Sequence, residues 1–152
     1  MESTAFERNF TFYTVPAAFI LLFLPKLYSF ALGGKYLDPA HPRKYQPAIA
    51  EADDIEAKTK ARILRAESAF ANGLETVSLY AAAVASTHAA RADPAAANAL
   101  ALAYLASRAA YNVVYVFLQG RDPRWALVRS AVWFAGVGLV LAMFALAGAA
   151  VY

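Results

Sequence analysis

The 152-residue chain contains no cysteine and only two histidines, and charged residues make up 16% of it. Without cysteine the protein forms neither a disulfide nor a thiolate of its own, so any sulfur chemistry needs a thiol brought by a ligand. His41 and His88 lie far apart and have no companions at metal-ligand spacing, so we expect no metal site. The net charge is +3, but the basic residues are not clustered as a nucleic-acid footprint would be, so nucleic acid is not an expected partner.

Apolar residues are abundant instead. The chain is 61% hydrophobic and its mean hydropathy is +0.42. A soluble domain of this length rarely reaches such an apolar fraction. The composition therefore predicts an integral membrane protein with one domain over residues 1–152, and the lipid bilayer is its first expected partner.

Four stretches are long and apolar enough to cross a bilayer. The pattern predicts an all-α fold, a four-transmembrane-helix bundle, with helices over about residues 10–32, 48–90, 94–118 and 125–150 and a loop over 33–47. The second helix is expected to begin in water and to run unbroken into the membrane. Asp93 is placed to cap the third helix, with Pro94 in its first turn. Lys26, the lone charge of the first span, is expected to snorkel to the boundary, and the alternative is that it reaches into a site.

Basic residues gather in the two loops on one side of these spans, over residues 33–62 and 119–124. Because loops rich in Lys and Arg remain in the cytosol, both loops are predicted to be cytosolic and both termini to lie on the other side. This predicts a multi-pass protein of the endoplasmic reticulum or another endomembrane in a eukaryote, or of the inner membrane in a bacterium.

A polar stripe enters the second predicted span. Arg65, Ser68, Asn72 and Glu75 fall at i, i+3, i+7 and i+10, so they share one face of a helix. Charged groups within a membrane are costly and seldom face lipid, which makes the stripe a candidate binding site. Arg65 lies nearest the water boundary, and simple solvation explains it equally well.

Further polar residues fall at the same predicted depth: Arg108 and Tyr115 in the third helix, and Arg129 and Ser130 at the start of the fourth. Arginines suit carboxylates, a glutamate suits an ammonium group, and an asparagine suits peptide-like groups. The set favours a small anionic or zwitterionic molecule held beside a second, lipophilic ligand. The alternative is an interhelical salt-bridge network, such as Glu75 with Arg108, that only holds the bundle together.

The motifs resemble those of the family of membrane-associated proteins in eicosanoid and glutathione metabolism. The resemblance is carried by Ala69, Asn72 and Glu75 in the second helix, by Arg108 and Tyr115 in the third, and by the stretches 65–75, 104–115 and 129–133. The three stretches resemble those of the less characterised fungal and bacterial members. The resemblance implies a left-handed four-helix bundle that forms a homotrimer and binds glutathione between adjacent subunits near the cytosolic face.

By the same resemblance, Asn72, Glu75, Arg108 and Tyr115 would hold glutathione. Arg129 would stabilise its sulfur as a thiolate, with Ser130 beside it and Tyr115 as a second donor. Arg65 would take the role of an arginine that well-studied members carry at the position of Ser68, one turn further in.

The leading hypothesis is a glutathione-dependent membrane enzyme that conjugates lipophilic electrophiles or reduces lipid hydroperoxides. The alternative on the same fold is a non-catalytic lipid-binding or scaffold protein, because fold alone does not decide activity. An unrelated four-span transporter is a third hypothesis, and it would expose its site to both sides in turn.

Overall fold

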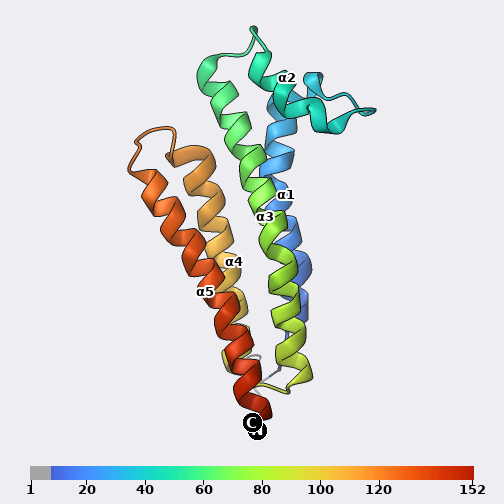
Figure 1. The fold of residues 1–152 in the computed structure, drawn as a ribbon, viewed down its shortest axis with the longest axis vertical. Helices are drawn as coiled ribbons and strands as arrows, with labels where there is room; N and C mark the ends of the chain where they lie inside the picture. Colours follow the sequence, from blue (N-terminus) through green and yellow to red (C-terminus); the bar gives the residue numbers. More distant parts are fainter. Residues whose placement is uncertain (1–7) are drawn as a thin grey trace.

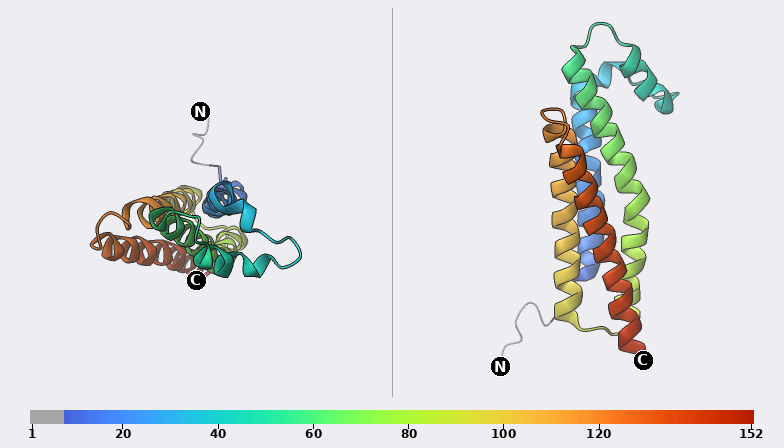
Figure 2. Two further views of the ribbon diagram at one scale, coloured as in Figure 1. Left: turned by 90° about the horizontal axis from the view of Figure 1, so that it is seen from above. Right: turned by 60° about the vertical axis from the view of Figure 1, so that its left-hand side comes forward.

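The structure is a computed structural model that describes residues 8–152, and four long helices dominate it (Figure 1). These are α1 (Thr11–Gly33), α3 (Ala57–Ala89), α4 (Pro94–Val113) and α5 (Trp125–Val151). Shorter elements join them: η2 (Gly34–Tyr36), η3 (Pro42–Lys44), α2 (Tyr45–Glu51) and η4 (Val114–Leu118). The long helices run side by side, with α1 against α3 and α4, and α5 against α3 and α4 (Figures 1 and 2).

Three segments are long and apolar enough to cross a membrane: Thr11–Tyr36, Pro94–Leu118 and Trp125–Val151. They confirm the prediction of an all-helical membrane protein in its general form. α3 has 33 residues, about 50 Å at about 1.5 Å per residue, so its length also suffices. It is not among the three because its polar residues lower its hydropathy, and a fourth span stays a prediction.

The predicted unbroken helix over 48–90 is wrong. The chain forms α2 and α3 with an extended break between them, where Ala52 has ψ 119° and Glu56 has ψ 134°. Aspartates in this stretch compete with helical hydrogen bonding. Asp54 instead accepts hydrogen bonds from Lys35 and Tyr36, which ties the break to the preceding loop. The Lys60 ammonium closes α2 by donating to the carbonyl of Ala50 at 3.0 Å.

The chain reverses direction at both ends of the bundle. α2 and the α4–α5 loop lie at one end, and the α3–α4 turn and the C-terminus lie at the other (Figure 1). This arrangement agrees with the predicted grouping of loops, while the side that faces the cytosol stays a prediction. The predicted helix cap is confirmed, because the Asp93 carboxylate accepts from the backbone N–H of Ala96 at 2.7 Å.

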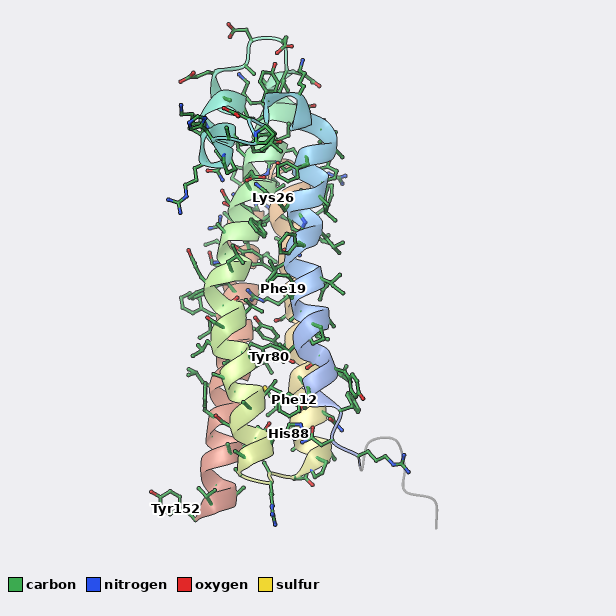
Figure 3. All side chains as sticks on the ribbon, turned by 90° about the vertical axis from the view of Figure 1, so that its right-hand side faces the viewer. Phe12, Phe19, Lys26, Tyr80, His88 and Tyr152 are labelled. Atoms are coloured by element: carbon green, nitrogen blue, oxygen red, sulfur yellow. The ribbon has the colours of Figure 1, made fainter. Side chains whose placement is uncertain are left out.

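The core between the helices is aromatic and closely packed. The rings of Tyr80 and Tyr104 stack with centroids 4.0 Å apart, and Tyr80 lies between α3 and α1 (Figure 3). The Tyr80 hydroxyl shares a hydrogen bond with Thr14, and Tyr104 donates to the Thr76 hydroxyl at 3.3 Å. These buried hydroxyls are thus satisfied by neighbouring helices, as an apolar environment requires.

Candidate functional site

A polar pocket of about 450 Å³ opens between α3, the end of α4 and α5. Six residues singled out from the sequence line it: Ser68, Asn72, Glu75, Tyr115, Arg129 and Ser130. Small-molecule sites commonly have volumes of about 300–1,000 Å³, so a ligand of tripeptide size fits. Residues from three separate helical segments therefore converge on one pocket.

Arg129 supplies the positive charge of this pocket. Its guanidinium lies 4.8 Å from the centroid of the Tyr115 ring and donates to the Gln119 amide oxygen at 3.3 Å. No ion pair joins it to a carboxylate in the described part of the chain. Its charge is therefore available to an anionic ligand, while the aromatic face and the amide fix its position.

Two buried polar atoms of the pocket residues have no hydrogen-bond partner within residues 8–152. They are the amide oxygen of Asn72 and the indole nitrogen of Trp133. A buried polar group without a partner is costly, so an acceptor and a donor are poised for a ligand here. The hydroxyls of Ser68 and Ser130 donate back to Leu64 and Ala126 at 3.0 and 3.1 Å, which leaves their oxygens able to accept.

Glu75 brings the negative charge, and its side chain is exposed. The alternative salt bridge between Glu75 and Arg108 is absent from the described structure, whose ion pairs are Lys26–Glu67, Lys35–Asp54 and Asp38–His41. Glu75 therefore does not join helices through that contact. A cation and an anion at one pocket match a zwitterionic ligand.

Arg108 does not line the polar pocket. It is 94% buried, and its guanidinium lies 5.6 and 5.1 Å from the ring centroids of Tyr104 and Tyr111. All three of its nitrogens lack hydrogen-bond partners within residues 8–152. Gly136 of α5 provides the space, since an added Cβ there would lie 3.0 Å from the Arg108 Cζ. Tyr111 lines both the pocket and the small cavity at Arg108, so it connects the two.

Arg65 also lies outside the pocket. Its Nη2 approaches the Val116 carbonyl oxygen at 3.4 Å, and its guanidinium packs over Gly120 in the α4–α5 loop. In this position it supports the end of α4. The predicted contacts of Arg65 and Arg108 with a ligand are therefore not made from this pocket within one chain.

A widened helical turn places Tyr115. The segment η4 is a π-helix in which the backbone N–H of Gln119 bonds the carbonyl of Val114 at 2.8 Å. Such insertions are rare and concentrate at functional sites. The sequence reading expected regular helix to residue 118 and gave no signal for this turn. Its effect is to set Tyr115 and Gln119 beside Arg129.

Sequence reasoning missed several residues that line the pocket: Gln46, Trp133 and Phe134. Trp133 follows Arg129 by four positions, so helical spacing was a usable signal. Gln46 belongs to α2, which is anchored by Tyr45. The Tyr45 hydroxyl donates to the Ser29 carbonyl at 2.8 Å, and burial raises the pKa of this phenol.

Lys26 does not snorkel as expected. Its ammonium lies 2.6 Å from the buried Glu67 carboxylate and 4.4 Å from the centroid of the Phe30 ring (Figure 3). The carboxylate makes the inward conformation favourable, because a paired charge in a low-dielectric interior is far less costly than an isolated one.

Metal binding has no comparable support, since residues 8–152 contain no group of three or more His, Asp or Glu placed to hold an ion.

Together these features define an all-helical membrane protein with a charged pocket near one end of its helix bundle. The model of the MAPEG family matches residues 10–149 of the 152-residue chain. The chain therefore belongs to the MAPEG family. Comparisons with curated proteins and with solved structures found no match.

Proposed function

We propose that the protein is a glutathione-dependent membrane enzyme that conjugates lipophilic electrophiles or reduces lipid hydroperoxides. The observation that carries the proposal is the convergence of Arg129, Tyr115, Asn72 and Glu75 on one pocket of a MAPEG chain. The family includes members with other activities, so the chemistry of the pocket is the basis for choosing among them.

The pocket residues fit the groups of glutathione. Glu75 would bind the ammonium group, and the unpartnered Asn72 oxygen would accept from a peptide N–H. Ser130 and the Trp133 indole supply an acceptor and a donor on the opposite wall. Glutathione would contribute a thiol, which the cysteine-free chain lacks.

Arg129 and Tyr115 are the proposed catalytic residues. A free thiol has a pKa of about 8.5, and lowering it by about two units requires about 2.7 kcal/mol of extra stabilisation of the anion. One or two charge-assisted hydrogen bonds of about 1.5–3 kcal/mol each supply that amount. Arg129 is always charged and lies in the second turn of α5, where the helix dipole adds positive potential. Tyr115 is a neutral donor beside it.

We further propose that the working unit is a homotrimer whose subunits share the site, with both loops in the cytosol. The openness of the pocket supports this, because Ser68, Glu75 and Phe134 are all exposed in the single chain. A neighbouring subunit would cover them and would bring further ligand contacts. Native mass spectrometry of detergent-solubilised protein should then show a trimer, and a monomer that binds glutathione fully would contradict the shared site.

The decisive experiment measures the ultraviolet absorbance of bound glutathione thiolate as a function of pH. Wild-type protein should bind glutathione saturably and show thiolate at neutral pH. Arg129→Ala should keep binding but lose the thiolate signal and most turnover with a lipophilic electrophile. Arg124→Ala is the matched control, since Arg124 is an exposed arginine in the preceding loop and does not line the pocket.

The alternative is a non-catalytic lipid-binding or scaffold protein on the same fold. Under this alternative, wild-type protein would show no thiolate at neutral pH even when glutathione binds. That result would remove the enzyme proposal and leave the family assignment unchanged.

A further inference from the structure

A second, apolar groove of about 340 Å³ lies between α1 and α4 and shares no lining residue with the polar pocket. Its walls include Leu21, Leu24, Val113 and Phe117, of which Leu24 and Val113 are about half exposed. Both helices belong to candidate membrane spans. The groove therefore lies on a surface that faces hydrocarbon or another protein.

The interior of this groove is not suited to a polar ligand. Asn112 lines it, but its amide nitrogen already donates to the Leu21 carbonyl at 2.9 Å. That carbonyl needs an outside donor because Pro25, four residues later, has no backbone N–H. With this pair satisfied, the remaining lining is suited to a hydrocarbon chain.

One end of the groove carries positive charge. The Tyr28 and Phe117 rings lie there with centroids 5.2 Å apart. The Arg62 guanidinium donates to the Tyr28 hydroxyl at 3.3 Å and lies 5.9 Å from the Phe117 centroid. The Arg62 Nε is buried without a hydrogen-bond partner, and no ion pair joins Arg62 to a carboxylate in residues 8–152.

This charged end lies at the membrane boundary. Phe117 is the penultimate residue of a candidate span, and the charged loop with Arg121, Asp122 and Arg124 follows it directly. An amphiphile whose chain lay in the groove would therefore hold its head group beside Arg62. The apolar groove suits the acyl chain of a lipid in that leaflet, and the cation at the membrane boundary suits an anionic head group.

A second copy of this chain is a less suitable occupant of the groove than an anionic lipid. The three candidate spans contain no Asp or Glu. α3 has two such residues over 57–89, Glu67, which is paired with Lys26, and Glu75, which lies in the polar pocket. Within its four long helices a neighbouring subunit thus offers no free carboxylate other than one already assigned to the pocket.

We propose that the α1–α4 groove binds an acyl chain of an anionic phospholipid whose phosphate is held by Arg62 and Tyr28. The site is independent of glutathione and of the proposed reaction. Arginine suits phosphate because its planar donors match the phosphate oxygens. An electroneutral head group would lack the net attraction to the cation.

The test is native mass spectrometry of the full-length protein titrated with dioleoylphosphatidylglycerol or dioleoylphosphatidylcholine. Wild type should retain the anionic lipid about tenfold more strongly, and Arg62→Gln should remove that preference. Arg62→Lys should keep most of it, and Arg124→Gln, which alters an exposed arginine that does not line the groove, should keep all of it. Equal retention of the two lipids by wild type would overturn the proposal.

A second pair of variants tests the groove without touching the charge. Val113→Trp fills the groove and should abolish retention of the lipid, whereas Leu127→Trp on α5, at a residue 77% exposed, should not. If Val113→Trp instead changes the oligomeric state and leaves lipid retention intact, the groove is a protein interface and the proposal fails. Retention of oleate with no retention of phosphatidylglycerol would also overturn it.

Discussion

The buried guanidinium of Arg108 occupies space that Gly136 leaves open on the facing helix. An added Cβ at Gly136 would lie 3.0 Å from both the Arg108 Cζ and the Ser107 hydroxyl oxygen, and nearer still to Nη2. Within residues 8–152 the Arg108 guanidinium has ring contacts with Tyr104 and Tyr111 and no hydrogen-bond partner, so this space decides its position. The pair gives a sharp test of how the core around the pocket is built.

Gly136→Ala should destabilise the protein by about 2 kcal/mol, since overpacking a tight core typically costs about 1–3 kcal/mol. Gly138→Ala is the matched control two residues along α5, where an added Cβ meets nothing within 4 Å. It should be neutral or stabilising by up to about 1 kcal/mol, the helix-propensity gain of alanine over glycine. Thermal unfolding in one detergent measures both, and equal unfolding temperatures would contradict the packing argument.

The Lys26–Glu67 ion pair should contribute to stability in a way that an exposed pair does not. Lys26→Met leaves a buried carboxylate unpaired and should cost about 3–5 kcal/mol. The double variant Lys26→Met with Glu67→Leu should recover most of that loss, because no charge then remains buried. Lys35→Met breaks an exposed pair with Asp54 and should change the unfolding temperature little, because water screens this pair. A similar loss for both lysine variants in thermal unfolding would mean that burial is not the cause.

The stability lost when the hydrogen bond from Asn112 to Leu21 is removed should depend on Pro25. Asn112→Leu should cost about 1–3 kcal/mol, because it leaves a buried carbonyl without a donor. In a Pro25→Ala background the restored backbone N–H can bond that carbonyl, so the same change should cost much less. A double-mutant cycle in thermal unfolding measures the coupling. Additive effects of the two changes would show that Asn112 acts through another contact.

The sequence predicted the long helices because their apolar length and their cap at Asp93 are local signals. It missed the break after α2, since the partners of Asp54 come from the preceding loop and α2 itself looks like ordinary helix. Residues that favour helix predict one unbroken helix unless a tertiary contact stabilises a break. Only the folded structure shows that such a contact exists.

The site was predicted in part for a similar reason. Asn72 and Glu75 share a helical stripe, and Arg129 begins a helix, so spacing sufficed to group them. Arg65 and Arg108 share the same stripes but face other partners, because the π turn and the glycine opposite Arg108 alter what each face meets. Local sequence predicts a boundary position for Lys26, because its ion-pair partner Glu67 lies 41 positions away and gives no local signal. Spacing identifies which face a residue occupies, and packing determines its neighbour.

We expect Glu75 to contribute to ligand affinity and not to the stability of the ligand-free protein. A comparison with Glu67 tests this expectation. Glu75 is exposed and makes no ion pair within residues 8–152, whereas Glu67 is buried and bonded to Lys26. Glu75→Gln should therefore leave the unfolding temperature of ligand-free protein unchanged. If its carboxylate binds the ammonium of glutathione, affinity should fall about tenfold or more, the loss of one charge-assisted hydrogen bond.

Glu67→Gln should show the opposite pattern, with a lower unfolding temperature caused by the unpaired Lys26 ammonium. Isothermal titration with glutathione and thermal unfolding of the ligand-free proteins supply the two measurements. S-methylglutathione serves as a further probe, because it retains the ammonium and lacks the ionisable thiol. Its affinity should fall with that of glutathione in Glu75→Gln, since the lost contact is to the ammonium and not to sulfur. Unchanged affinity in Glu75→Gln together with a lower unfolding temperature would place Glu75 among the residues that hold the bundle and would remove it from the binding site.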